Sequence, residues 1–102
     1  MQINVTTGND AVIIKLQGRF DFNSHRNFRA SIDTVLSNPQ QRKIIRVDLG
    51  AVDYLDSSAL GMLLILRDKA QAIGGTVELI NCHGNVAQIL DVANFKALFS
   101  IA

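Results

Sequence analysis

Short runs of apolar residues in the first part of the chain predict a β-hairpin. Residues 12–16 are mostly β-branched and are followed closely by Gly18, which is typical of a strand that ends there. Ile3 and Val5 alternate with polar residues and predict a weaker strand before it. Residues 8–10, Gly-Asn-Asp, favour a tight turn, so we expect the two strands to pair in antiparallel fashion.

The next segment has the pattern of an amphipathic helix. Asn23 and Ser24 favour a helix start, and Pro39 marks its end. Between them, apolar residues recur on one helical face: Phe28, Ile32, Val35 and Leu36.

The longest predicted helix opens at residues 56–58, Asp-Ser-Ser, and stops at the glycine pair 74–75. At 100° per residue, one side forms a core stripe of Ala59, Leu63, Leu66, Ala70 and Ile73. The opposite side collects Ser57, Gly61, Leu64 and Asp68, with Ile65 close by. Ser57 should therefore face outward, and the two large apolar residues are either covered by a neighbouring segment or form a protein-contact surface.

Strands and helices alternate along the rest of the chain. Residues 43–49 and 76–80 predict strands, and residues 85–92 predict a short helix. The last apolar residues are expected to complete the core: Phe95, Leu98, Phe99 and Ile101. The order predicts an α/β fold with a mixed, mostly parallel sheet of four or five strands, an antiparallel N-terminal edge hairpin, and helices packed mainly on one face.

Composition indicates one globular domain over residues 1–102, with 48% hydrophobic and 19% charged residues. The net charge of +1 gives no field that would attract nucleic acid or an anionic membrane. Without a long apolar run or a secretory signal, we expect a cytoplasmic protein that does not insert into membranes. Cys82 is the single cysteine, so neither an internal disulfide nor a zinc site is expected, and no other metal or cofactor is indicated.

Ser57 is the candidate for chemistry. A phosphate at a helix N-terminus meets free backbone N–H groups, so the fold would tolerate phosphorylation, whereas the added charge would disrupt a contact surface. The residue pattern alone leaves open that Asp56 and Ser58 simply cap the helix and that Ser57 has no special role. A nucleophilic serine is disfavoured, because the Gly-x-Ser-x-Gly motif is absent and neither His25 nor His83 has an evident orienting carboxylate. We therefore expect no enzymatic activity and no catalytic residue.

Acidic residues follow the second and third predicted strands. Asp21 comes after the second strand, and a loop over residues 53–56 is expected after the third. Loops after parallel strands gather at one end of a sheet, so Asp21 is expected near Ser57 unless it only caps a turn.

Two adjacent segments carry a family resemblance. Residues 47–49, Val-Asp-Leu, followed by residues 52–61, Val-Asp-Tyr-Leu-Asp-Ser-Ser-Ala-Leu-Gly, resemble the signature of STAS domains, in particular the bacterial anti-sigma factor antagonists. Weaker matches at residues 16–21, 73–75 and 89–95 occur in the right order, so the resemblance covers essentially the whole chain.

The resemblance implies a phosphoprotein that regulates transcription by partner switching. It implies that the unphosphorylated protein binds a GHKL-type serine kinase that is also an anti-sigma factor. It further implies that phosphorylation of Ser57 releases this partner and that a PPM-type serine phosphatase reverses the modification. The expected phosphosite environment and partner surface comprise Asp21, Asp56, Ser58, Gly61, Leu64, Ile65 and Asp68.

One departure and one alternative accompany the resemblance. The family usually reads Asp-Ser-Ser-Gly-Leu-Gly, and here Ala59 replaces the first glycine. The same fold also serves as a non-phosphorylated STAS subunit of lipid-transport ATPase complexes. Those relatives often lack a serine at the acceptor position, so Ser57 argues against this alternative.

Overall fold

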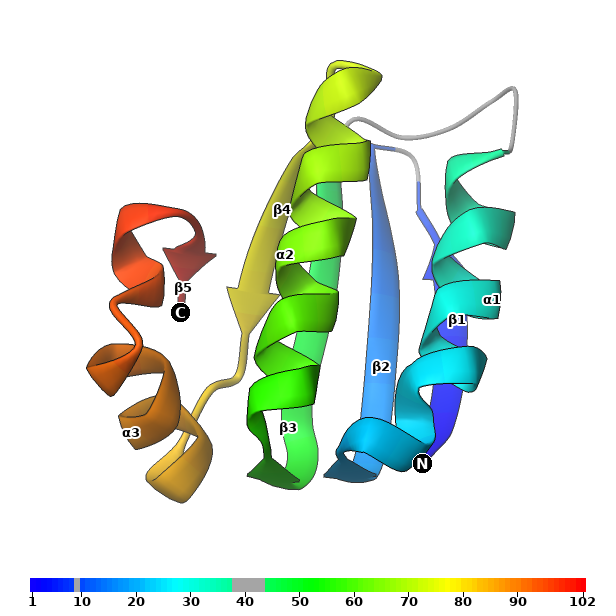
Figure 1. The fold of residues 1–102 in the computed structure, drawn as a ribbon. Coiled ribbons are helices and arrows are strands. Elements are labelled where there is room, and N and C mark those ends of the chain that lie inside the picture. Colours follow the sequence, from blue (N-terminus) through cyan, green and yellow to red (C-terminus); the bar gives the residue numbers. More distant parts are fainter. Residues whose placement is uncertain (9, 38–43) are drawn as a thin grey trace.

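A computed structural model describes residues 1–8, 10–37 and 44–102. These residues form a five-stranded sheet in the order β1-β2-β3-β4-β5 (Figure 1). β1 pairs with β2 antiparallel and the other neighbours are parallel, as the sequence predicts. The strands are β1 Gln2–Thr7, β2 Ala11–Phe20, β3 Ile44–Leu55, β4 Thr76–Ile80 and β5 Ser100–Ile101.

The helices cover one face of this sheet. The α-helices are α1 His25–Leu36, α2 Ser57–Ala72 and α3 Gly84–Val92, and the short 3₁₀ turns are η1 Phe22–Ser24 and η2 Phe95–Ala97. In Figure 1, α1 and α2 run in front of the strands, with α3 beyond the β4 side. Burial alternates along β3: Val47 and Leu49 are fully buried, whereas Arg46 is half-buried and bonds Glu78 across the open face at 2.8 Å. In the part of the chain that the structure describes, no helix is long and apolar enough to span a bilayer.

The core stripe predicted for α2 is confirmed except at its last residue. Ala59, Leu63, Leu66 and Ala70 are fully buried, but Ile73 is 42% exposed. Ile73 is the C-cap residue, and Gly74 turns the chain away with a positive φ of 80°. The helix therefore stops at the predicted glycine pair. Ile73 lies just outside the helix, and its side chain does not reach the core.

Two strands are longer than the sequence predicts. β2 continues past Gly18, which has a φ of 99° and lies beside shifts in the β2–β3 register, so this glycine bends the strand and does not end it. β3 continues to Leu55, although residues 53–55 are predicted as a loop. The reason is that Val52 and Leu55 are buried and pair with Gly18 and Phe20, so Asp56 alone joins β3 to α2.

The first helix starts where the sequence predicts, with Ser24 as the N-cap residue of α1, but the Ser24 side chain makes no capping hydrogen bond to that helix. Asp21 caps the η1 turn that leads into α1. The Ser24 side chain is buried and donates its hydroxyl to the carbonyl of Arg19 at 3.1 Å. The predicted apolar face is confirmed, with Phe28, Ile32 and Val35 buried and Leu36 packed against them. Pro39 and residue 43, predicted as a helix stop and a strand start, lie outside the described residues.

The carboxyl-terminal segment places only some of its apolar residues in the core. Phe95 and Phe99 are buried and stack with ring centroids 5.2 Å apart, and Ile101 is half-buried in β5. Leu98, predicted as a core residue, is 42% exposed, because the η2 turn directs its neighbours Phe95 and Phe99 inward.

This difference in burial predicts that shortening Phe95 and Leu98 to alanine lowers the free energy of unfolding by different amounts. Phe95→Ala should lower the free energy of unfolding by about 3–5 kcal/mol, since it opens a cavity in the core. Leu98→Ala should cost about 1 kcal/mol or less, because its side chain is already 42% exposed. Urea unfolding followed by circular dichroism measures both, and similar midpoint shifts for the two variants would contradict this assignment of the core.

Candidate functional site

Ser57 is the first residue of α2 and is exposed at the surface. The preceding Asp56 is the N-cap, in an extended conformation, and its Oδ1 accepts a hydrogen bond of 2.9 Å from the backbone N–H of Ala59. This cap fixes the first turn of the helix while leaving the Ser57 side chain accessible. The predicted outward orientation of this serine is therefore what the structure shows.

The second carboxylate oxygen of Asp56 reaches a different segment of the chain. Oδ2 accepts a hydrogen bond of 3.0 Å from the backbone N–H of Phe22, the first residue of η1. The backbone N–H of Asp56 also donates to the carbonyl of Phe20 at the end of β2, at 3.3 Å. One residue thus connects the end of β2, the η1 turn and the start of α2.

Asp21 is the N-cap residue of the same η1 turn. Its Oδ1 accepts a hydrogen bond of 3.0 Å from the Asn23 backbone, as part of a capping box with Ser24. Its Oδ2 lies 3.6 Å from Nε of Arg19, and the guanidinium of Arg19 stacks 4.4 Å from the centre of the Tyr54 ring. The structure therefore brings the carboxylates of Asp21 and Asp56 to the first residues of the same three-residue turn, at the end of the molecule where Ser57 lies (Figure 1).

Fewer side chains are exposed on the outer face of α2 than the sequence predicts. Asp68 is exposed, and at Gly61 an added Cβ would meet only open space. Leu64, Ile65 and Ser58 are half-buried, and the first two pack against the core. Ile65 lies one turn before Lys69, which pairs with Asp33 of α1 at 3.8 Å, so the side of α2 that carries Ile65 faces α1.

Ala59, which replaces the usual glycine of the family, is fully buried. Its methyl group therefore fills space inside the domain and adds nothing to the surface next to Ser57.

Two exposed apolar side chains were not singled out from the sequence. Phe22 is 72% exposed on η1, and Val92 is 88% exposed at the end of α3. Val92 helps to line a mostly apolar hollow of about 530 Å³ between α2 and α3, together with Leu60, Asn85, Gln88, Ile89 and Ala93. In the sequence, Phe22 comes directly after the candidate Asp21, which draws attention to it. The alternation of apolar and polar residues could not show which of Phe20 and Phe22 points outward, because the strand ends between them.

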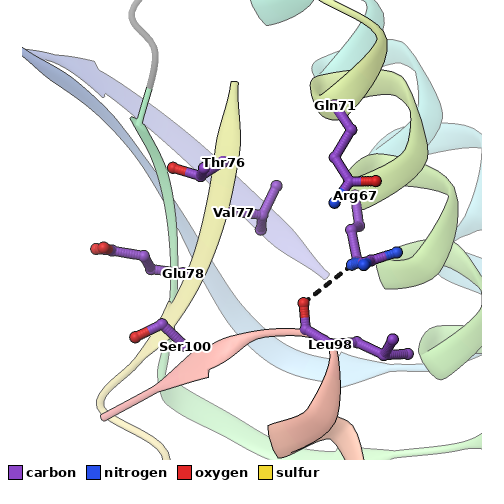
Figure 2. Close-up of a pocket in the computed structure, with 7 residues that line it drawn as sticks. All are labelled: Arg67, Gln71, Thr76, Val77, Glu78, Leu98 and Ser100. Atoms are coloured by element: carbon purple, nitrogen blue, oxygen red, sulfur yellow. Dashed lines mark hydrogen bonds between the residues drawn. The ribbon is translucent and has the colours of Figure 1, made fainter. Parts of the chain in front are cut away.

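A second hollow of about 300 Å³ lies along the carboxyl-terminal half of α2 and the edge of β4 (Figure 2). Figure 2 shows the Arg67 and Gln71 side chains on the α2 side, and Thr76 and Ser100 on the strands. Arg67 donates from Nε to the carbonyl of Leu98 at 2.9 Å, which holds the chain after η2 against α2. The two α2 residues that line this hollow, Arg67 and Gln71, lie more than two helical turns after Ser57, so the hollow is separate from the candidate site.

Two further side chains with reactive groups, those of Cys82 and His83, follow β4 in the chain. His83 Nε2 lies 2.9 Å from the carbonyl oxygen of Gly50, and Cys82 is half-buried. Burial, and to a smaller extent the carboxylate of Asp48, raises the pKa of the Cys82 thiol above its ordinary value. Within residues 1–8, 10–37 and 44–102, no group of acidic, histidine and cysteine side chains could hold a metal ion.

The raised pKa predicts a thiol that reacts slowly. At pH 8 the folded protein should be alkylated by iodoacetamide more slowly than the urea-unfolded chain, because the thiolate is the reactive form. The rate should rise with pH and the two rates should converge only above the ordinary pKa of a cysteine. Equal rates at pH 8, measured by intact mass spectrometry, would contradict the described surroundings of Cys82.

The two hydrogen bonds of Asp56 predict a graded effect of substitution. Asp56→Ala removes both and should lower the free energy of unfolding by about 1–3 kcal/mol. Asp56→Asn keeps one amide oxygen, which can cap α2 but cannot also accept from Phe22, so its cost should be smaller. Thermal unfolding measures both, with Asp68→Ala as the exposed control. Equal destabilisation by the alanine and asparagine variants would argue against the double role.

Comparison with known proteins agrees with this geometry. The STAS domain family model matches residues 2–102. The STAS-domain containing protein PA14_20770 of Pseudomonas aeruginosa (strain UCBPP-PA14) is 47% identical over 89 residues, which are 87% of this chain and 85% of that protein.

Solved structures share the fold at lower identity. An anti-sigma factor antagonist from Mycobacterium paratuberculosis has a TM-score of 0.85 at 16% identity, over 98% of this chain and 83% of that one. The Bacillus anti-sigma factor antagonist SpoIIAA, in its unphosphorylated form, has a TM-score of 0.77 at 20% identity, over 99% and 87% of the two chains. SpoIIAA in its phosphorylated form gives 0.74 at 20% identity, over 99% and 91%. The STAS domain of a SulP transporter from Vibrio cholerae has a TM-score of 0.77 at 17% identity, over 94% and 75%.

The exposed serine at the start of α2, the mixed sheet covered on one face and the match over residues 2–102 lead to one assignment: the chain belongs to the STAS domain family and has the fold of its anti-sigma factor antagonists.

Proposed function

We propose that this protein is an anti-sigma factor antagonist that works by partner switching through Ser57. In its unphosphorylated form it binds a GHKL-type serine kinase that also acts as an anti-sigma factor. The kinase transfers the γ-phosphoryl group of ATP to Ser57 Oγ, ADP leaves, and the phosphorylated protein is released. A PPM-type phosphatase then hydrolyses the phosphoserine with water, which restores the serine and yields inorganic phosphate. The cycle takes place in the cytoplasm, and the protein itself supplies no catalytic residue.

The observation that carries this proposal is the exposed Ser57 hydroxyl in the first turn of a capped helix. A kinase can reach it without unfolding the domain, because Asp56 and not Ser57 makes the capping hydrogen bond. A phosphate at this position would also face the positive end of the α2 dipole, so the phosphorylated domain is expected to stay folded.

Charge explains why phosphorylation would release the partner. The end of the molecule that carries Ser57 already holds the carboxylates of Asp21 and Asp56, which both accept backbone hydrogen bonds from the η1 turn. A phosphate adds about −1.5 to −2 charges at pH 7, which must be desolvated in any tight interface. Each 1.4 kcal/mol of added cost weakens binding about tenfold, so a modest penalty is sufficient for release.

The partner surface proposed from the structure runs along the exposed residues of α2 around Ser57. Gly61 leaves the backbone open one turn after the serine, and Asp68 lies farther along the same side. Leu64 and Ile65 contribute the edges of their partly covered side chains.

A non-phosphorylated subunit of a lipid-transport ATPase complex remains the alternative function. The SulP transporter STAS domain shares the fold at 17% identity, and this likeness supports the common architecture alone. The two functions differ in what they require of Ser57. A constitutive transporter subunit should bind its partner equally well with alanine or aspartate at this position.

Substitution of Ser57 tests the proposal. Binding of the cognate serine kinase, measured by isothermal titration calorimetry, should be retained by Ser57→Ala and weakened about tenfold or more by Ser57→Asp. Ser100→Ala, at an exposed serine on β5 outside the expected partner surface, is the matched control and should bind as the wild type does. Protein purified from its own host should carry a single phosphate, on Ser57, by intact mass spectrometry and peptide mapping. Tight kinase binding by Ser57→Asp would refute the switch, and labelling of Ser57 by a fluorophosphonate would indicate a hydrolase instead.

A further inference from the structure

We propose that Phe22 is the apolar anchor by which the kinase recognises this protein, and that Asp56 is the positioning residue that holds the anchor beside Ser57. This inference rests on the proposed function, and it names the part of the surface that determines the partner. The partner surface expected from the sequence includes Asp21, which caps this turn, and residues at the start and along the outer face of α2, but not Phe22.

Phe22 differs from the other aromatic residues of the chain in its exposure. It is 72% exposed, whereas Phe20, Phe28, Phe95 and Phe99 are buried and Tyr54 is half-buried against Arg19. A phenylalanine this exposed gives the folded domain little packing energy, whereas aromatic side chains are among the strongest contributors when they are buried in protein interfaces.

The η1 turn presents this side chain on a fixed backbone. The capping box of Asp21 and Ser24 closes the turn, and the buried Ser24 hydroxyl ties it to the carbonyl of Arg19. The backbone N–H of Phe22 is itself bound by Asp56 Oδ2 at 3.0 Å. Because the backbone is already ordered, docking of Phe22 would lose little conformational entropy, and this favours its use as an anchor.

The anchor and the phosphoacceptor are coupled through one carboxylate. Asp56 holds Phe22 with one oxygen and the first turn of α2 with the other, and Ser57 is the next residue. The η1 turn and the start of α2 lie at the same end of the sheet in Figure 1. A kinase that receives Phe22 in an apolar pocket would therefore have the Ser57 hydroxyl presented at a set position.

The partner that fits this arrangement is the kinase, with an apolar pocket next to its ATP site. A pocket is expected because a single protruding ring, flanked by Asp21 and Asp56, is too small for a flat apolar interface. The other conceivable occupant, a second copy of this chain, is distinguished by the experiment.

Phosphorylation kinetics test the anchor. With the purified cognate kinase and ATP, Phe22→Ala should raise the KM for this protein about tenfold or more and leave kcat within about twofold, because the contact aids binding and not the chemical step. Phe22→Leu should recover part of the loss, since it restores an apolar side chain. Asp56→Asn, which can serve only one of the two hydrogen bonds, should give an intermediate KM.

Val5→Ala is the matched control, because Val5 is 45% exposed on β1, away from η1, and its substitution should leave both constants unchanged. Urea unfolding should show that Phe22→Ala is folded, as expected for a mostly exposed side chain.

Each outcome separates the two proposals. If the wild type is phosphorylated on Ser57 but Phe22→Ala has a wild-type KM, the anchor is wrong and the partner switch stands. If the kinase does not phosphorylate the wild type, the proposed function fails and the anchor fails with it. If light scattering shows a wild-type dimer that Phe22→Ala converts to a monomer with unchanged KM, Phe22 serves self-association and the anchor is overturned.

Discussion

The Asp56 carboxylate is the interaction on which the arrangement of the candidate site depends. One oxygen accepts a hydrogen bond from Phe22, 34 residues away in the sequence, and the other accepts from Ala59 and caps the helix that begins at Ser57. Its backbone adds a third link, to the carbonyl of Phe20. Segments that are distant in sequence are thereby held at one end of the sheet, and a serine hydroxyl can be exposed there without loosening the helix that carries it.

The one-sided architecture explains why this end of the domain is available. Helices bury the face of the sheet that carries Val47 and Leu49, while the opposite face carries the Arg46–Glu78 ion pair. The stability of the domain therefore comes from the layer between sheet and helices, and the loops at the strand ends contribute less. A charge added at Ser57 would meet solvent and backbone dipoles and stay outside this layer, as the proposed phosphorylation requires.

Periodicity predicted most of the fold but not the details of the site. The apolar rows of α1 and α2 and the alternation in β4 identified these elements, because each pattern reflects burial of one face. The pattern could not show that Val52 and Leu55 prolong β3, since pairing with the end of β2 is a tertiary constraint. Nor could it separate Phe95, which is buried, from Leu98, which is exposed. Asp56 was expected as a cap, yet its second hydrogen bond, to Phe22, depends on a turn that has no periodic signal.

Gly61 lies in the middle of α2, where glycine weakens a helix by roughly 1 kcal/mol relative to alanine. Nothing inside the domain requires this cost, because a methyl group at that position would extend into empty space and the backbone there needs no positive φ. The bare stretch of backbone would let the proposed partner come closer than any side chain would allow. The glycine thus gives up some helix stability and leaves a smooth surface one turn from Ser57.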